Sequence, residues 1–323
     1  MTQYGFYGRL SAAFPSQFIV DVTEVCNLAC IHCPHPDFKK SHHYASRYLE
    51  PELHDKLVDE VKQWGKGRTQ YIRYTSQGEP MIHPKLFEMM SYAVRESGVM
   101  VTLTTNGTLM NEKRIEKLLA TGVDVVDTSI DAFSHDTYAT IRVQGDLAVT
   151  RANVLKLIAM RKHAVKPLKV VVSYVEQPQN QHETDDFETY WKDQGADYVV
   201  VRRLHSCAGA KSEKADAMRH EAEEEARRPC LYPWERISLA PDGFIKFCPE
   251  DWVHGSTVAD YRRSTVKELW QGEFMQSLRE AHLTNQFAKH PFCGQCPDWK
   301  STRWPGEGRS YANMMEELKE AAV

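Results

Sequence analysis

Short runs of β-branched and other apolar residues alternate with longer amphipathic segments over the N-terminal part of the chain. The apolar runs predict six strands, at residues 18–22, 70–75, 99–104, 124–130, 168–175 and 198–202. The segments between them have the apolar spacing of helices, at residues 51–64, 84–97, 111–120, 146–164 and 183–194. Regular alternation of strands and helices predicts an α/β fold with a parallel sheet.

Right-handed crossovers between parallel strands would curl this sheet into a full or partial (β/α)6 barrel, which we assign to residues 1–210. In such folds the reactive groups lie at the carboxyl ends of the strands. Motifs that follow successive strands are therefore expected to meet at one edge of the sheet.

The pattern changes after residue 210. Residues 211–228 are highly charged and lack a clear apolar stripe, which predicts an exposed linker helix. Two short apolar runs then flank Pro241-Asp242-Gly243, which is typical of a β-hairpin, and a helix is predicted over residues 264–282. We therefore expect residues 229–323 to form a small α+β domain with a C-terminal tail.

The composition is that of a soluble globular protein, with 42% apolar and 26% charged residues in a chain of 323. A formal net charge of −4 argues against an electrostatic surface for nucleic acid. No apolar run approaches the ~20 residues of a membrane span, and the first residues do not resemble a secretory signal. We expect a cytoplasmic protein without nucleic-acid or membrane partners.

The eight cysteines are unevenly distributed: three lie near the N-terminus, four in the last third, and Cys207 stands apart. In a reducing compartment this grouping indicates metal or cluster ligation rather than disulfides. The N-terminal set follows the first strand with CxxxCxxC spacing, at Cys26, Cys30 and Cys33. Three thiolates can hold three irons of a cubane cluster and leave the fourth iron open, whereas electron-transfer clusters usually have four cysteines. The alternative is a zinc site completed by His32, His35, His42 or His43.

In spacing and position this loop resembles the signature of the radical S-adenosylmethionine (SAM) superfamily. The resemblance implies a [4Fe–4S] cluster whose open iron is chelated by SAM. It also implies reductive cleavage of SAM to a 5′-deoxyadenosyl radical, which takes a hydrogen atom from the substrate. His32, directly before the last cysteine, is expected to shield the cluster and to contact the adenine.

Motifs after the following strands resemble the SAM-contacting motifs of the same superfamily. Residues 76–80, Ser-Gln-Gly-Glu-Pro, resemble its GGEP motif with glutamine in place of the first glycine. Each motif is weak alone, because Gly-Glu-Pro and Asn-Gly also occur in ordinary turns, but together they follow successive strands. The resemblance implies SAM contacts from Gly78, Glu79, Pro80, Thr105, Asn106, Ser129, Asp131 and Arg142, the last pairing with the methionyl carboxylate.

The four C-terminal cysteines can hold a second [4Fe–4S] cluster or a tetrahedral zinc ion, and their spacing alone does not decide between the two. The segment resembles the SPASM extension in its shortened, "twitch" form, which implies one auxiliary [4Fe–4S] cluster. With full protein ligation the cluster is expected to accept or relay an electron, or else only to brace the domain. The predicted ligands are Cys230, Cys248, Cys293 and Cys296.

Cys207 follows the sixth predicted strand and is expected to face the substrate. Its thiol can return a hydrogen atom to a carbon radical; the alternative is an inert buried side chain. Arg202, Arg203 and His205 precede it and are predicted to bind an anionic or hydroxylated substrate, unless they are only surface charges. Asp251 is predicted to be a polar or acid–base group of the active site, or else a helix cap.

The resemblance favours a dehydrogenase acting on a small polar substrate of the sugar or aminocyclitol type, with the auxiliary cluster as electron acceptor. The alternatives are a radical epimerase with Cys207 as hydrogen donor, a decarboxylase of a sugar acid, and an enzyme that modifies ribosomal peptides. A one-electron donor such as flavodoxin or ferredoxin is expected as a partner. The contrasting class is a non-enzymatic iron–sulfur or zinc protein.

Overall fold

The computed structural model describes residues 12–75, 77–211, 213–214, 227–301, 314–315 and 317–318. The six predicted strands are present, and each pairs in parallel with its neighbour in sequence. They are β1 (Gln17–Val20), β2 (Tyr71–Tyr74), β3 (Met100–Thr105), β4 (Val125–Ser129), β5 (Lys169–Glu176) and β6 (Tyr198–Arg203).

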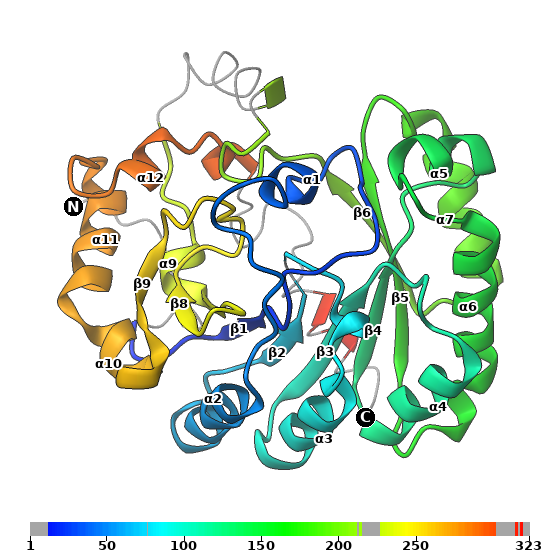
Figure 1. Ribbon diagram of the computed structural model, residues 1–323, viewed down its shortest axis with the longest axis horizontal. Coiled ribbons are helices and arrows are strands. Elements are labelled where there is room, and N and C mark those ends of the chain that lie inside the picture. Colours follow the sequence, from blue (N-terminus) through cyan, green and yellow to red (C-terminus); the bar gives the residue numbers. More distant parts are fainter. Residues whose placement is uncertain are drawn as a thin grey trace.

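The five predicted helices also form, and they lie along the outer face of the sheet (Figure 1). They are α2 (Pro51–Trp64), α3 (Leu86–Glu96), α4 (Glu112–Thr121), α6 (Leu147–Met160) and α7 (Thr184–Asp193). Side chains of Asn111 and Asp146 accept hydrogen bonds from the first turns of α4 and α6, which fixes where these helices begin. The predicted helix over 146–164 ends earlier, because its last turn is the 3-10 helix η2 (Arg161–His163).

Two short helices, α1 (His35–Phe38) and α5 (His135–Ile141), were not predicted. Four and seven residues are too few to show a helical apolar period. Further single turns are the 3-10 helices η1 (Pro80–Ile82) and η3 (Gln181–Glu183).

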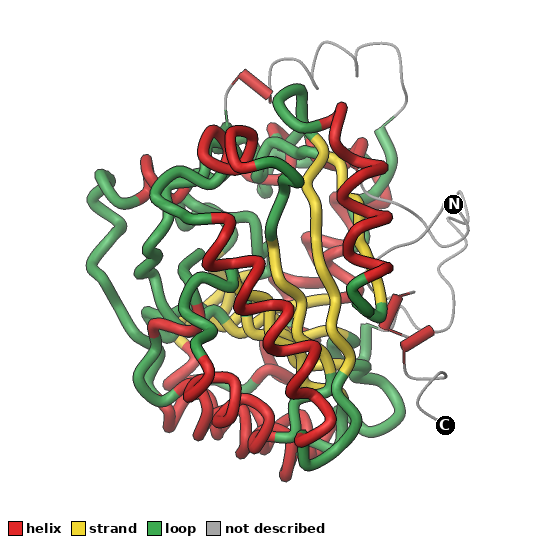
Figure 2. Tube along the Cα trace, turned by 90° about the vertical axis from the view of Figure 1, so that its right-hand side faces the viewer, coloured by secondary structure: helices red, strands yellow, loops and turns green. Residues whose placement is uncertain are grey.

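Successive residues of the strands point to opposite faces of the sheet, and the two faces differ in composition. Ile72, Val126 and Val172 belong to the main core between the sheet and its helices. Their neighbours Tyr71 and Val125 instead face the inside of the curved sheet. The strands are thus enclosed by the helices on one side, as the turned view in Figure 2 shows.

The inner face is partly filled by the end of the chain. Met314, Met315 and Leu318 are buried against Tyr71 and Val125. In Figure 1 this C-terminal segment lies within the curve of the sheet, close to β2–β4. It covers the part of the inner face away from the carboxyl ends of the strands, so the site described below lies at the other end.

The C-terminal region continues the same sheet. Strand β7 (Arg236–Leu239) pairs in parallel with β1, and β8 (Phe244–Lys246) and β9 (Thr257–Asp260) follow in antiparallel order, so the predicted hairpin is confirmed as β7–β8. The sheet order is β6-β5-β4-β3-β2-β1-β7-β8-β9. Helices and turns beside it are α9 (Tyr232–Glu235), η4 (Tyr261–Arg263), α10 (Val266–Gln271), α11 (Glu273–Thr284), α12 (Pro291–Gln295) and η5 (Asp298–Ser301).

The single helix predicted over 264–282 was wrong, because the chain breaks at Gly272 into α10 and α11. Gly272 has extended backbone angles, and a β-carbon there would lie 2.8 Å from the Glu268 carbonyl oxygen.

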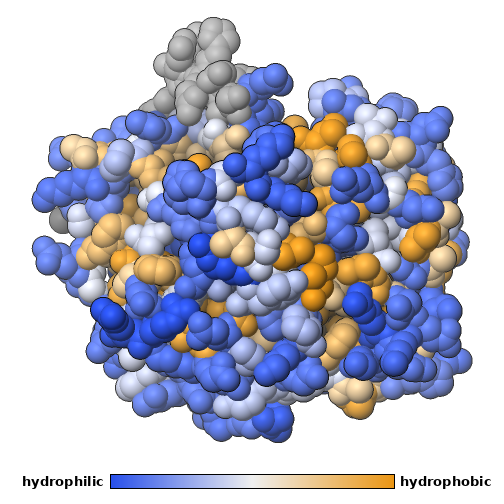
Figure 3. Space-filling model, in the orientation of Figure 1, coloured by the Kyte–Doolittle hydropathy of each residue, from blue (hydrophilic) through white to orange (hydrophobic). Residues whose placement is uncertain are grey.

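Most of the predicted linker helix lies outside the described residues, and the boundaries at 210 and 229 stay predictions. No helix among the described residues is long and apolar enough to cross a membrane. The face shown in Figure 3 is mostly hydrophilic, with apolar residues in separate patches.

Candidate active site

The three N-terminal cysteines lie on the loop between β1 and α1, and neighbouring segments hold that loop in place. Backbone nitrogens of Ala29 and Ile31 donate to carbonyls at the end of α5, at 2.9 and 3.0 Å. Asn27 accepts a hydrogen bond from Asn106 at 2.9 Å, which ties the loop to the turn after β3. The cysteine loop is therefore fixed from two sides before any metal binds.

Burial raises the pKa of each thiol in this loop, that of Cys26 to about 12. Such thiols stay protonated at neutral pH unless a metal centre replaces the proton. Two donors are directed at the sulfurs: the His35 backbone nitrogen lies 3.4 Å from the Cys33 sulfur, and Arg142 Nη1 lies 3.7 Å from the Cys30 sulfur. Hydrogen bonds of this kind fit thiolate ligands of an iron–sulfur cluster.

The zinc alternative fits less well. His35 directs Nε2 at the Glu24 carbonyl oxygen (2.8 Å), and His43 stacks on His254 with ring centroids 4.6 Å apart. A tetrahedral zinc ion also needs sulfur atoms within about 4 Å of one another. Among the described residues, His205, Cys207 and Glu250 have their ligand atoms within 4.8 Å of one another. Neither cysteine set meets this criterion with three or more of its sulfurs. Wider sulfur spacing suits a cubane.

Residues 77–80, which resemble the GGEP motif, pack directly on the cysteine loop. A β-carbon on Gly78 would lie 2.2 Å from the Thr23 carbonyl oxygen, so only glycine fits there. The Glu79 backbone nitrogen donates to the Val25 carbonyl at 2.9 Å. Gln77, the departure from the motif, donates its side-chain amide to the Asp251 carbonyl at 2.8 Å. The substitution thus joins the motif to the C-terminal region.

The Glu79 carboxylate is occupied by protein donors. It accepts hydrogen bonds from the Thr105 hydroxyl at 2.7 Å and from the backbone nitrogens of Met81 and Asn106 at 3.0 and 2.7 Å. Pro80 begins the turn η1. These contacts join the ends of β2 and β3 and leave the backbone of this segment, rather than the Glu79 carboxylate, as the part best placed to meet a ligand.

Asp131 and Arg142 form a buried ion pair after β4, and His32 lies beside it. The Asp131 carboxylate lies 2.5 Å from Arg142 Nη2 and 3.6 Å from His32 Nε2, and Asp131 itself adopts a positive φ of 64°. Burial lowers the pKa of His32 to about 4, so the ring is neutral at pH 7. Arg142 Nε is buried without a hydrogen-bond partner, an unmet donor that suits a ligand carboxylate. Ser129, at the end of β4, is half-buried.

The four C-terminal cysteines come from three segments: Cys230 before α9, Cys248 after β8, and Cys293 and Cys296 around α12. Burial raises the pKa of the last three thiols, that of Cys296 to about 12. Arg227 donates to the Gly294 carbonyl at 2.9 Å and places its positive charge near the sulfurs. Four thiols and a neighbouring arginine fit a fully ligated, anionic cluster.

Cys207 lies on the loop after β6, next to the first cysteine set. It is 8% exposed and packs with Phe38 and Trp252, with Cys33 beside them. Cys207 and Ala208 both have positive φ, at 53° and 54°, an uncommon conformation for these residues. Burial raises the pKa of the Cys207 thiol, which keeps it protonated at neutral pH. Cys207 therefore lies beside the three-cysteine loop, and that it faces the substrate stays a prediction.

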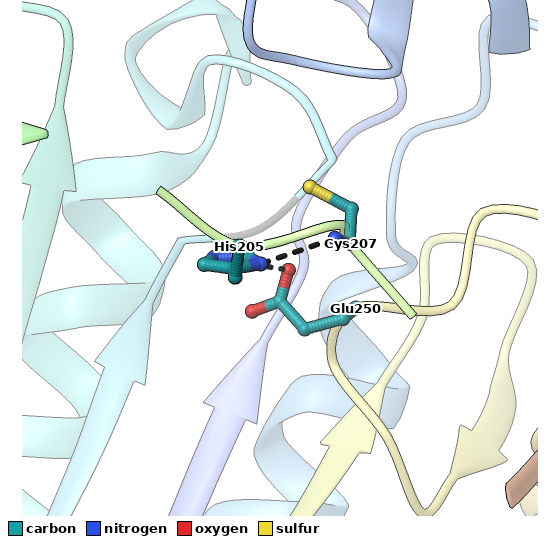
Figure 4. Close-up of side chains that lie close together, drawn as sticks. All are labelled: His205, Cys207 and Glu250. Carbon is teal, nitrogen blue, oxygen red and sulfur yellow. Dashed lines mark hydrogen bonds and ion pairs between the residues drawn. The ribbon is translucent and has the colours of Figure 1, made fainter. Parts of the chain in front are cut away.

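Two carboxylates from the auxiliary-cluster segments hold this loop. Asp298, two residues after Cys296, accepts hydrogen bonds from the backbone nitrogens of Ser206 (2.8 Å) and Ala208 (2.6 Å). Glu250, two residues after Cys248, lies 3.9 Å from His205 Nε2 (Figure 4). Sequence reasoning missed both acids, because nothing in the sequence pattern of residues 250 and 298 indicates contact with residues 205–208.

The remaining predicted residues have more ordinary surroundings. Arg202 points to the inner face and pairs with the buried Asp127 at 2.7 Å, whereas Arg203 is exposed. The buried Asp251 carboxylate accepts four hydrogen bonds from residues 253–256, including both the nitrogen and the hydroxyl of Ser256. That geometry favours a role in holding its loop over the predicted acid–base role.

A parallel sheet with three thiols on the loop after its first strand, continued by a region with four further thiols, has the architecture of an iron–sulfur enzyme with two cluster sites. The family comparison agrees. Residues 20–187 match the model of the radical SAM superfamily, and residues 230–297 match SPASM, an iron–sulfur cluster-binding domain. The chain belongs to the radical SAM superfamily, and the two domains imply [4Fe–4S] clusters and SAM as its cofactors.

Similar proteins differ widely in activity. The chain is 34% identical over 38% of its length to "AdoMet-dependent heme synthase" of Methanosarcina barkeri, covering 33% of that protein. It is 26% identical over 57% of its length to the "Tungsten-containing aldehyde ferredoxin oxidoreductase cofactor-modifying protein" of Pyrococcus furiosus, covering 50%. The chain thus spans between a third and a half of these curated relatives.

Solved structures share the fold at low identity. BtrN in complex with AdoMet and 2-DOIA matches with a TM-score of 0.58 and 16% identity, over 88% of this chain and 93% of that one. Native anSMEcpe with bound AdoMet matches with a TM-score of 0.62 and 13% identity, over 95% of each chain. SuiB of Streptococcus suis with S-adenosylmethionine gives 0.61 and 13%, over 94% and 75%. At these identities the likeness shows the fold alone.

Proposed function

We propose that this enzyme inverts a carbon centre of a small polar substrate of the sugar or aminocyclitol type, with Cys207 returning the hydrogen atom. One observation carries the proposal: the Cys207 thiol is buried against the three-cysteine loop, beside Cys33, at the carboxyl end of β6. A thiol in that place, kept protonated by burial, is a hydrogen-atom donor next to the point where a substrate radical would form.

The SAM site is supported by residues that surround the cysteine loop. Gly78 gives the close backbone approach, and Arg142 gives an unpaired buried Nε for the methionyl carboxylate. His32, neutral and 3.6 Å from Asp131, would cover the cluster. When bound there, the cluster and SAM supply the 5′-deoxyadenosyl radical that takes a hydrogen atom from substrate carbon. A flavodoxin- or ferredoxin-type donor would supply the electron.

Dehydrogenation is the second candidate, and a different observation favours it. Asp298 and Glu250, each two residues from an auxiliary cysteine, both reach the loop that carries Cys207. This brings the auxiliary segment to the reaction site, as required if a substrate radical passes its electron to the auxiliary cluster and leaves a ketone. In that case Cys207 would not exchange hydrogen with the substrate.

A solvent-isotope experiment separates the two reactions. The anaerobically reconstituted enzyme is incubated in D2O with a panel of sugars and aminocyclitols. Epimerisation through Cys207 predicts one deuterium from solvent at the inverted carbon, and its loss in Cys207→Ala. Val253→Ser, at an exposed position near Trp252, is the control variant. A ketone product without solvent deuterium, formed equally by Cys207→Ala, would support the dehydrogenase and overturn the epimerase.

A further inference from the structure

We infer that His205, held between Glu250 and Asp298, is the proton donor that restores the Cys207 thiol after each turnover. The inference rests on the proposed epimerase function and concerns a step after inversion. It assigns a catalytic role to His205, which the sequence predicted only as a substrate-binding residue, and positioning roles to two carboxylates that the sequence did not predict.

The chemistry of a thiol donor requires such a step. When Cys207 gives its hydrogen atom to the substrate radical, a C–H bond forms, the S–H bond breaks, and the sulfur is left as a thiyl radical. Regeneration needs one electron and one proton. The electron would come from the external one-electron donor, by way of the auxiliary cluster that Cys230, Cys248, Cys293 and Cys296 would hold, and the proton must come from a nearby acid. A second turnover is impossible until both have arrived.

The His205 ring lies close to the Cys207 sulfur and accepts a hydrogen bond from the Cys207 backbone nitrogen. The ligand atoms of His205, Cys207 and Glu250 all lie within 4.8 Å of one another. Figure 4 shows the three side chains gathered from two segments, with His205 and Cys207 on the loop after β6 and Glu250 on the loop after β8. The His205 side chain is 37% exposed, so a proton that it loses can be replaced from water.

The ring nitrogen Nδ1 of His205 has a partner in either protonation state. The Cys207 backbone nitrogen donates to it at 3.1 Å, which suits the neutral ring. Asp298 Oδ2 lies 3.8 Å away and can accept from Nδ1 when the ring is protonated. Since Asp298 is fixed by the backbone nitrogens of Ser206 and Ala208, this acceptor is held in place. A ring accommodated in both states is suited to proton transfer.

The surrounding charges favour a proton on this ring. Burial lowers the pKa of His205, but Glu250, Asp298 and Cys207 outweigh it and raise the pKa well above its ordinary value. Two further groups within electrostatic reach of the same region are His32, which burial keeps neutral, and Lys211. These charges act in the same direction as the geometry, which places the ring beside Cys207.

A divalent metal ion on His205, Cys207 and Glu250 is the competing interpretation of the same cluster. It would hold Cys207 as a thiolate and remove its hydrogen atom from use. While Nδ1 accepts from the Cys207 backbone nitrogen, Nε2 carries the proton of the neutral ring and faces Glu250, so no ring nitrogen is left for a metal ion. The metal analysis described below decides between the two interpretations.

The test compares the first turnover with later ones in His205→Ala, with substrate in D2O. We expect a first turnover of one deuterated product per chain, within about twofold of the wild type, followed by a steady-state rate lower by about 10²-fold or more. Added imidazole should restore the steady state. His182→Ala, at an exposed histidine of η3, is the matched control. Equal loss of both phases, or an unchanged steady state, would overturn the inference.

Two readouts are independent of turnover. In the reconstituted enzyme seven cysteines are cluster ligands, so alkylation followed by peptide mass spectrometry reports on Cys207. The dependence of the Cys207 alkylation rate on pH should change in His205→Ala and Glu250→Gln but not in His182→Ala. An unchanged dependence in the first two variants would contradict proton transfer between His205 and Cys207. Metal analysis should find no stoichiometric zinc. If zinc is bound by the wild type and lost in His205→Ala, then His205 belongs to a metal site and is not the proton donor. If wild-type product carries no solvent deuterium, the proposed function itself fails.

Discussion

The two cysteine sites of this protein differ in how many of the ligands and hydrogen-bond partners at each site come from the protein itself. The first has three thiols, a glycine whose backbone packs directly on their loop (Gly78), and an arginine with an unpaired buried nitrogen (Arg142). The second has four thiols, and Arg227 is already engaged with the carbonyl oxygens of Cys293 and Gly294. The comparison shows how one chain builds a site that awaits a ligand and another that is closed.

The largest expected effect comes from removing one thiol from each site. Cys30→Ala should reduce iron from about eight to about four per chain, because one cubane is lost, and should abolish 5′-deoxyadenosine formation. Cys296→Ala should also lose iron but retain uncoupled cleavage of SAM. Iron counting and chromatography of 5′-deoxyadenosine check both variants. Equal cleavage activity in the two would show that the sites do not differ in the way described.

Adding a side chain at Gly78 should weaken ligand binding at the three-cysteine site alone. The new β-carbon of Gly78→Ala would lie 2.2 Å from the Thr23 carbonyl oxygen, so the cysteine loop must shift. We expect a cost of about 1–3 kcal/mol in stability, as for other overpacked positions, and weaker SAM binding measured by equilibrium dialysis. Gly67→Ala, strained in backbone but with no atom within 4 Å, is the control. Unchanged SAM affinity would argue against a role of the Gly78 backbone in the SAM site.

Loosening Asp251 should lower stability without changing the chemistry. Its carboxylate accepts four hydrogen bonds within the loop that leads from Cys248 to β9. Asp251→Ala leaves these donors, the two buried ones of Ser256 among them, without their acceptor and should cost about 3 kcal/mol in unfolding free energy, measured by denaturant titration of the holoenzyme. SAM cleavage by the folded fraction should be retained. Normal stability with lost hydrogen abstraction would instead support the acid–base role.

A smaller effect is expected when the charge beside the closed site is removed. The guanidinium of Arg227 lies near the sulfurs and 4.2 Å from the Phe287 ring centroid. Arg227→Gln should make the reduction potential of the auxiliary cluster more negative, since a positive charge stabilises the reduced cluster. Redox titration followed by EPR checks this, with the exposed Arg263→Gln as control. A potential shift in the first cluster instead would contradict the assignment.

Much of the fold could be predicted from apolar periodicity, because β1 to β6 and their long helices are each stabilised by a face that the local sequence encodes. The break at Gly272 was missed, since the apolar pattern continues across it. The two cysteine sets could be recognised from their spacing and from the family resemblance, but the acids around Cys207 could not. Glu250 and Asp298 meet residues 205–208 only because the auxiliary segment folds back over the ends of the strands. Contacts made by such long-range packing leave no periodic signal.

The most direct test of the account is rapid freeze-quench EPR of Cys207→Ala with a substrate that gains solvent deuterium in the wild-type reaction. If the Cys207 thiol is the hydrogen donor, a carbon-centred substrate radical should accumulate in the variant and stay undetected in the wild type under the same conditions. A variant that accumulates no radical and still forms inverted product at the wild-type rate would show that the hydrogen atom comes from another group.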